Sequence, residues 1–296
     1  MKNLILIIVL ISNLVEAQIN PYSLNEVVSI IQIDTDKYDV LCKNHAREIV
    51  TKADILTENI CPYIQPVPQK EKVDILYVID NSGSMGLLQS NFAQQSDTII
   101  NNLKAKNLDF KIAVTTTDSY YGDLFLNNGC KLCKVEQTEF RSGIKYKNKV
   151  IHENTLNAAE SLSENIKVGS NGSGDERPLS SLLAAINSPL NTGFLRTGSR
   201  LEVIIFTDEE DFSHGKINLN ESYSNPDLFP ISKFIANLDF ISKENKLKTY
   251  AVKTISVLDD ECLVRLGQGR KIGLRLLDLV KANPLGKSQS ICDYLN

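Results

Sequence analysis

The chain has 296 residues, of which 42% are hydrophobic and 23% charged, a balance typical of a soluble globular protein. Its 32 basic and 36 acidic side chains give a net charge of −4. This charge argues against general nucleic-acid binding, because neutralising phosphates requires a basic excess. With three histidines and no tryptophan, the composition also disfavours His-rich metal sites and most His-based catalytic sets.

The first 17 residues have the pattern of a secretory signal peptide. Lys2 precedes an apolar run, Leu4–Ile11, and the segment ends on the small residue Ala17. The run is too short to span a bilayer, and no cysteine follows the expected cleavage point to carry a lipid. We therefore expect an exported protein, periplasmic, secreted or at the cell surface, with no membrane span in the mature chain.

Export makes the six cysteines candidates for disulfides. Proximity along the chain favours the pairs Cys42–Cys61, Cys130–Cys133 and Cys262–Cys292. The Cys130–Cys133 pair could instead be redox-active, which usually requires the first cysteine at a helix N-terminus. It follows the turn-forming residues 127–129 and precedes a polar stretch, so a structural loop crosslink is favoured.

The mature chain divides into an N-terminal extension, residues 18–72, and a larger domain, residues 73–296. In the extension, Glu26–Ile33 has the pattern of a strand and Asn44–Thr57 that of a polar helix. Three prolines between residues 62 and 68 then deny both helix and central strand, so residues 61–72 are expected to form a linker or a wrapping segment.

From residue 73 onward, short apolar runs alternate with segments of helical period, which predicts an α/β domain with a parallel sheet between two helical layers. The predicted strands are Val73–Ile79, Phe110–Val114, Lys145–Ile151, Leu201–Phe206, Thr249–Val257 and Ser288–Cys292. The predicted helices are Leu88–Leu103, Asn154–Ile166, Leu179–Ile186, Ile231–Leu238 and Leu274–Val280. Such sheets bind ligands at the carboxyl ends of their strands.

Three loops at this edge carry oxygen-bearing side chains. The first strand is followed by Asp80, Ser82 and Ser84 at alternate positions, and the strand ending at Phe206 by Thr207 and Asp208. The loop 169–178 adds a further hydroxyl, for which Ser173 is the best candidate. Oxygen ligands suit a hard cation such as Mg²⁺ or Mn²⁺, and less so Ca²⁺. The alternative for Asp80 or Ser82 is a helix N-cap.

The motifs VIDNSGSM (residues 78–85), GSGDE (172–176) and TDEED (207–211) make residues 71–296 resemble a von Willebrand factor type A domain of the exported bacterial type. The resemblance implies a six-stranded, mostly parallel, doubly wound sheet. It also implies a metal-ion-dependent adhesion site formed by Asp80, Ser82, Ser84 and Asp208. Family members usually have Thr in the second motif; Ser173 takes that place here, with Asp175 or Glu176 as alternatives.

Family members usually close with a helix after the last strand, and the sequence ends soon after residue 292. We therefore expect part of one sheet face to be uncovered, unless residues 18–72 cover it.

In such sites the cation keeps a position open for a carboxylate from outside. We therefore expect a metal-dependent protein-binding module, not an enzyme, whose partner protein supplies an Asp or Glu. The alternatives are a metal-dependent hydrolase and a structural envelope protein with a stabilising cation. Glu209, Glu210 and Asp211 are expected to form a solvated acidic turn, and His214 is the one histidine close in sequence to the third motif.

Overall fold

The structure is a computed structural model that describes residues 27–42, 47–51, 70–127, 130–217 and 219–295. The chain divides into two compact units, Met1–Gln69 and Lys70–Asn296. The predicted signal peptide and the predicted Cys42–Cys61 pair, which depends on Cys61, lie outside the described residues.

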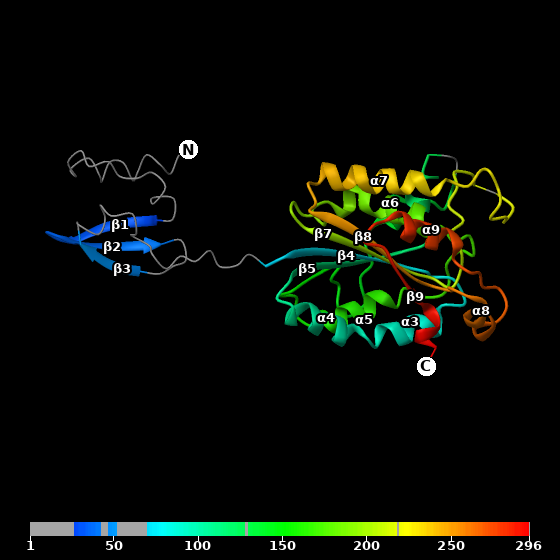
Figure 1. The fold of residues 1–296 in the computed structure, drawn as a ribbon, viewed down its shortest axis with the longest axis horizontal. Coiled ribbons are helices and arrows are strands. Elements are labelled where there is room, and N and C mark those ends of the chain that lie inside the picture. The colour runs from blue at the N-terminus through cyan, green and yellow to red at the C-terminus, as the bar shows by residue number, and fades with distance from the viewer. Residues whose placement is uncertain (1–26, 43–46, 52–69, 128–129, 218, 296) are drawn as a thin grey trace. The chain divides into compact units, whose positions relative to one another are not determined.

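The first unit contains a three-stranded antiparallel sheet of β1 (Val27–Asp34), β2 (Lys37–Cys42) and β3 (Arg47–Thr51) (Figure 1). β1 lies where a strand was expected. The helix expected around residues 44–57 is wrong over β3, which pairs with β2 through Asp39 and Ile49. The β-branched residues of β3 favour an extended strand, and a pairing partner becomes visible only in the fold.

The second unit is built on a six-stranded sheet with the order β6-β5-β4-β7-β8-β9. All neighbouring strands are parallel except β6, which runs antiparallel to β5 at one edge. The strands are β4 (Lys72–Ile79), β5 (Asp109–Thr116), β6 (Val150–His152), β7 (Arg200–Phe206), β8 (Thr249–Ser256) and β9 (Lys287–Ser290). The α/β fold with a mostly parallel sheet is therefore confirmed.

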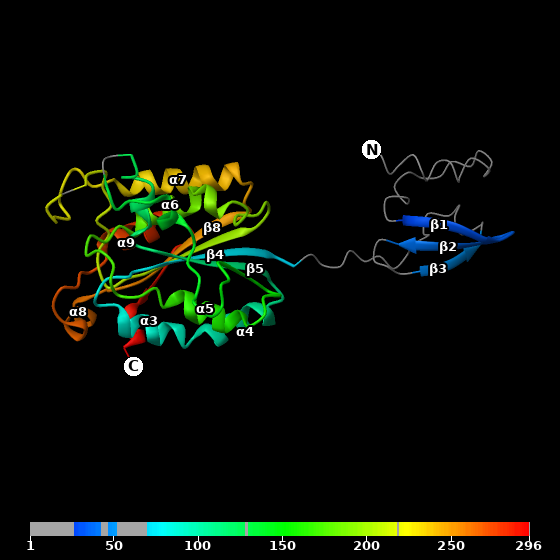
Figure 2. The same ribbon diagram turned by 180° about the vertical axis from the view of Figure 1, so that it is seen from behind.

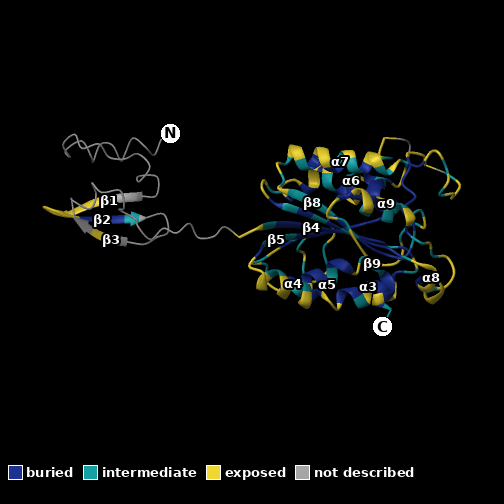
Figure 3. Ribbon diagram, viewed as in Figure 1, coloured by how far each residue is buried: buried dark blue, intermediate teal, exposed yellow. Residues whose placement is uncertain are grey.

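Helices cover both faces of this sheet, with α3, α4 and α5 on one side and α6, α7 and α9 on the other (Figures 1 and 2). The helices are α3 (Gly86–Ala93), α4 (Ser96–Ala105), α5 (Ala158–Ile166), α6 (Pro178–Asn187), α7 (Ile231–Glu244), α8 (Asp260–Leu266) and α9 (Leu274–Ala282). The central strands are buried on both faces, as Figure 3 shows, which explains their unbroken apolar sequences.

Several elements differ from the predictions. The helix expected over Leu88–Leu103 is two helices, broken at Gln94 and Gln95 without any Gly or Pro. Ser96 and Asp97, residue types that favour helix starts, mark the second one. The edge strand expected over Lys145–Ile151 is shorter, since β6 begins only at Val150. Helix α8 has no counterpart among the predicted helices. Asp259 accepts the Cys262 backbone N–H at 2.8 Å and caps α8.

The last strand is followed by a short 3₁₀ helix, Ile291–Tyr294, in place of the predicted end of a strand. Tyr294 packs edge-on against Phe92 and Phe206, with ring centroids 5.3 and 5.4 Å apart. The predicted Cys262–Cys292 disulfide ties this segment to α8, and the predicted Cys130–Cys133 disulfide is also formed. On the same face of the sheet, Glu202, Ile204 and Lys253 remain partly exposed, so part of this face is less well covered than the central strands.

We predict that Tyr294→Ala destabilises the second unit by about 3 kcal/mol, because it leaves a cavity between α3 and the sheet. The matched variant Tyr294→Phe keeps the ring and should cost under about 1 kcal/mol. Urea unfolding of the mature chain, followed by circular dichroism, measures both. Equal stability of the alanine variant and the wild type would show that this segment does not cover the core.

Candidate functional site

The candidate site begins where β4 ends. Ile79 lies opposite Phe206 in the β4–β7 register, and the Asp80 backbone N–H donates to the Phe206 carbonyl at 2.9 Å. The Asp80 carboxylate accepts the Ser82 backbone N–H at 2.7 Å and the Thr207 hydroxyl at 2.6 Å. The Asp80 side chain thus stabilises the turn that follows β4 and connects this loop to the loop after β7.

Ser82, Ser84 and Asp208 continue this network. The Ser82 and Ser84 hydroxyl oxygens lie 3.0 Å apart, and the Ser84 hydroxyl donates to Oδ1 of Asp208 at 2.9 Å. Four of the predicted site residues therefore belong to one hydrogen-bonded cluster drawn from two loops. Asp80 and Asp208 are fully buried, Ser82 is buried and Ser84 is partly exposed.

Ser173 has other partners. Its hydroxyl oxygen accepts the Tyr121 hydroxyl at 3.3 Å and the Asp175 backbone N–H at 3.0 Å. Its own backbone N–H donates to Asp118 at 3.0 Å, and the Asn81 amide donates to the same carboxylate oxygen. These contacts join the loop of residues 169–178, here called the second loop, to the first loop, which follows β4; the third loop follows β7. They engage the Ser173 hydroxyl away from the cluster around Asp80.

Glu176 is the acidic residue of the second loop that faces Asp80. Its side chain is 1% exposed, and neither carboxylate oxygen has a hydrogen bond of good geometry among the described residues, although the Thr117 side chain lies close enough to lower its pKa. Burial, followed by the charge of Asp80, raises the pKa of Glu176 to about 10. A buried carboxyl group without a hydrogen bond is costly, so its position requires an explanation.

The buried carboxyl groups of the cluster repel one another. Burial, followed by the charge of Asp208, raises the pKa of Asp80 to about 6. Burial also raises the pKa of Asp208, against the opposing effects of Ser84 and Arg270. A divalent cation among these oxygens would relieve the repulsion, and carboxylate and hydroxyl oxygens are suitable ligands for it. The donor chemistry therefore fits a hard cation.

No group of three or more His, Cys, Asp or Glu side chains placed to hold a metal occurs in the described part of the chain. A cation site here must therefore include the serine hydroxyls.

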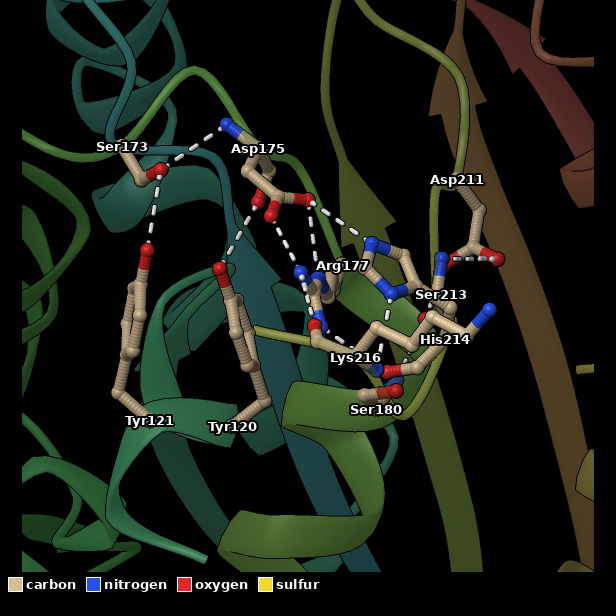
Figure 4. Close-up of polar contacts among 10 residues, drawn as sticks. All are labelled: Tyr120, Tyr121, Ser173, Asp175, Arg177, Ser180, Asp211, Ser213, His214 and Lys216. Carbon is tan, nitrogen blue, oxygen red and sulfur yellow. Dashed lines mark hydrogen bonds and ion pairs between the residues drawn. The ribbon is translucent and has the colours of Figure 1, made fainter. Parts of the chain in front are cut away.

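Arg177 anchors the second loop to the segment that follows the third loop (Figure 4). It is fully buried and forms an ion pair with Asp175, with the guanidinium Nε donating at 2.9 Å. The same guanidinium donates to the carbonyls of His214 at 2.9 Å and Lys216 at 3.2 Å, and lies 4.5 Å from the Tyr120 ring centroid. Asp175 is thus occupied by Arg177, which joins the second loop to the chain after the third.

Glu210 and Asp211 are buried, so the expected solvated turn is wrong for these two residues. Asp211 accepts the Leu179 backbone N–H at 3.2 Å in the first turn of α6. Glu210 accepts the Arg275 backbone N–H at 2.9 Å in the first turn of α9, and the Arg275 side chain pairs with Asp211. The two acids cap two helices that begin far away in the sequence, which explains their burial.

His214 is also buried, and burial lowers its pKa to about 4. Its Nδ1 accepts the Lys216 backbone N–H at 3.1 Å, while Nε2 lies 3.9 Å from Asp175 (Figure 4). A neutral histidine without solvent access does not suit contact with an external ligand.

Gln89 is a site residue that sequence reasoning missed. Its buried amide group donates to the Asp80 carbonyl at 2.7 Å and to the Gly169 carbonyl at 2.8 Å. It also accepts the Gly169 backbone N–H at 3.2 Å. Gln89 therefore holds the first and second loops together from α3. A single glutamine in a helix has no sequence signature that could reveal this.

No protein-family model matches this chain, and no curated protein does. Solved structures that match include the pilus adhesin SpaC from Lactobacillus rhamnosus GG in its open conformation and a second crystal structure of that adhesin. Each is 12% identical, with a TM-score of 0.41, and the match covers 76% of this chain and 29% of the adhesin. Similarity at this level supports no assignment of function.

In the described residues, no helix combines the length and the apolar character needed to cross a bilayer.

Proposed function

We propose that the second unit is an exported von Willebrand factor type A domain that binds a divalent cation where β4 and β7 end. Through the cation it would bind a carboxylate of a partner protein. The observation that carries this proposal is the connected cluster of Asp80, Ser82, Ser84 and Asp208 beside the unpaired carboxyl group of Glu176. The two disulfides of this unit are consistent with an oxidising compartment.

The proposed ligand set differs from the first expectation at one position. Glu176, rather than Ser173, would complete the set formed by Asp80, Ser82, Ser84 and Asp208. The Ser173 hydroxyl is engaged by Tyr121 and Asp175, whereas Glu176 lies beside Asp80 with both oxygens unpaired. Asp175 is unsuited because it pairs with Arg177.

Mg²⁺ is the proposed cation, with Mn²⁺ next and Ca²⁺ less suitable. Carboxylate and hydroxyl oxygens are hard ligands, and Mg²⁺ commonly combines a few protein oxygens with water molecules that an outside ligand can replace. When bound, the cation would supply the positive charge that attracts a partner's Asp or Glu. The same residues would also suit a metal-dependent hydrolase or a cation that only stabilises the loops, and the experiments below separate these functions.

Asp80→Asn and Asp208→Asn should each weaken Mg²⁺ binding at least ~100-fold, because each removes a charged ligand. Isothermal titration of the mature chain measures this. Asp97→Asn, on the exposed surface of α4, is the charge-matched control and should bind as the wild type does. Binding by the wild type that neither site variant affects would place the cation elsewhere.

Glu176→Gln should weaken Mg²⁺ binding at least ~10-fold, whereas Ser173→Ala should change it less than ~3-fold. Without cation, the Glu176→Gln variant should unfold at a temperature equal to or above that of the wild type. The substitution removes a buried carboxyl group whose negative charge would repel that of Asp80. Titration and thermal unfolding with EDTA or Mg²⁺ give both readouts. A larger effect from Ser173→Ala would restore the serine as the ligand.

Peptides selected from a random displayed library in Mg²⁺ and released by EDTA should share an Asp or Glu. Replacing that residue with its amide should abolish binding to the domain, because a neutral side chain is a poor substitute for a carboxylate ligand. If the peptides that bind in Mg²⁺ were not released by EDTA, binding through the cation would be excluded. Hydrolysis of phosphoester or peptide substrates with Mn²⁺, lost in Asp80→Asn, would instead indicate an enzyme.

A further inference from the structure

Arg270 lies at the proposed cation site and plays no part in the ligand set. Its Nε donates to Oδ2 of Asp208 at 3.0 Å, the carboxylate oxygen that Ser84 does not use. The Arg270 side chain is 25% exposed, whereas that of Asp208 is fully buried. A ligand approaching from solvent therefore reaches the guanidinium group before it reaches Asp208.

The loop that presents Arg270 is held in place. Gly267 and Gly269 have φ angles of 88° and 83°, which favour glycine, and they bend the chain between α8 and α9. The Lys271 backbone N–H donates to the Asp208 carbonyl at 3.3 Å, and Arg270 Nη1 donates to the Gln268 carbonyl. The position of Arg270 is thus tied to the backbone of the third loop as well as to its carboxylate.

Asp80 and Glu209 are the acidic groups that interact electrostatically with Asp208. Glu209 is partly exposed at the rim, and its carboxyl group also interacts with Asp80, Glu221 and Arg270 itself. Arg177, the buried cation of the second loop, is occupied by Asp175. Lys271 points its ammonium group toward Glu221, 3.9 Å away, and toward the Tyr223 ring. Arg270 is therefore the cationic side chain paired with the cluster itself, among the described residues.

We propose that Arg270 has two opposing effects at this site: its charge competes with the cation for Asp208, and its guanidinium group binds the partner's carboxylate. This inference rests on the proposed function and extends it. A positive charge bonded to a ligand weakens binding of a second cation to the same oxygen. A guanidinium group presents several donors in one plane and suits a carboxylate, so an acidic ligand would contact two positive groups.

The consequence is a coupling between cation and acidic ligand. A carboxylate that neutralises both positive groups favours cation binding, and by linkage the cation favours the carboxylate to the same degree. The domain would hold its cation weakly alone and more tightly with an acidic partner. A guanidinium group that only braced the loop would have neither effect.

The test compares Arg270→Gln, Arg270→Lys and the wild type in the mature chain, with Mg²⁺ alone as the first probe. Arg270→Gln should bind Mg²⁺ about tenfold more tightly in isothermal titration, while Arg270→Lys, which keeps the charge, should stay within ~3-fold of the wild type. Arg265→Gln is the control for net charge, because Arg265 is exposed on α8 and its side chain donates to the Cys292 carbonyl at 3.5 Å, away from Asp208 in the hydrogen-bond network of the described residues.

The second probe is an Asp-containing peptide selected on the wild type in Mg²⁺. At saturating Mg²⁺, Arg270→Gln should bind this peptide about tenfold more weakly, opposite in sign to its effect on the cation. Thermal unfolding adds a readout of folding: the variant should be less stable than the wild type in EDTA, and the difference should shrink in excess Mg²⁺.

Unchanged or weaker Mg²⁺ binding by a folded Arg270→Gln would overturn the inference, and so would an equal loss of thermal stability in EDTA and in Mg²⁺. If the wild type itself bound no Mg²⁺, the proposed function would fail together with the inference. Binding by the wild type that Arg270→Gln leaves unaltered would refute the role of Arg270 alone.

Discussion

The candidate site depends on the parallel pairing of β4 with β7. In that register Ile79 and Phe206 are partners, so the residues that follow them, Asp80 and Thr207, meet at the same edge of the sheet. The bond from the Thr207 hydroxyl to the Asp80 carboxylate, at 2.6 Å, is the direct product of this alignment. A shift of one residue in either strand would separate them, because side chains would then point to the opposite face. The buried apolar faces of both strands prevent such a shift.

Buried polar contacts between distant segments help to shape the loops around this edge. Glu210 and Asp211 cap α9 and α6, Arg177 bonds to Asp175 and to two carbonyls, and Gln89 joins the first and second loops. Removing one partner of such a contact leaves the other buried and unsatisfied, which costs more than the contact contributes. Breaking any single contact of this network is therefore costly, and the network holds the buried carboxyl groups of Asp80 and Glu176 in place.

The parts that sequence alone could predict are those carried by local pattern. Apolar runs such as Val73–Ile79 predict the buried strands. Because ligands bind at the carboxyl ends of such strands, the sequence also predicts a single site formed by Asp80, Ser82, Ser84 and Asp208. Glu210 was misjudged because its partner, the Arg275 N–H, lies 65 residues away. Glu176 and Ser173 both offer a ligand oxygen and are only three residues apart, so their different surroundings in the fold are needed to choose between them.

The same reasoning explains why Arg270 was not anticipated and why it matters. It comes from an irregular loop between α8 and α9, and α8 itself was not predicted. Its charge offsets part of the repulsion between Asp208 and the neighbouring acids, so it stabilises the fold while occupying an oxygen that the proposed cation would need. Under the proposed function, a residue that serves stability in this way would lower the affinity of the site for a cation alone. An acidic partner would restore that affinity, because its carboxylate could interact with both positive groups at once.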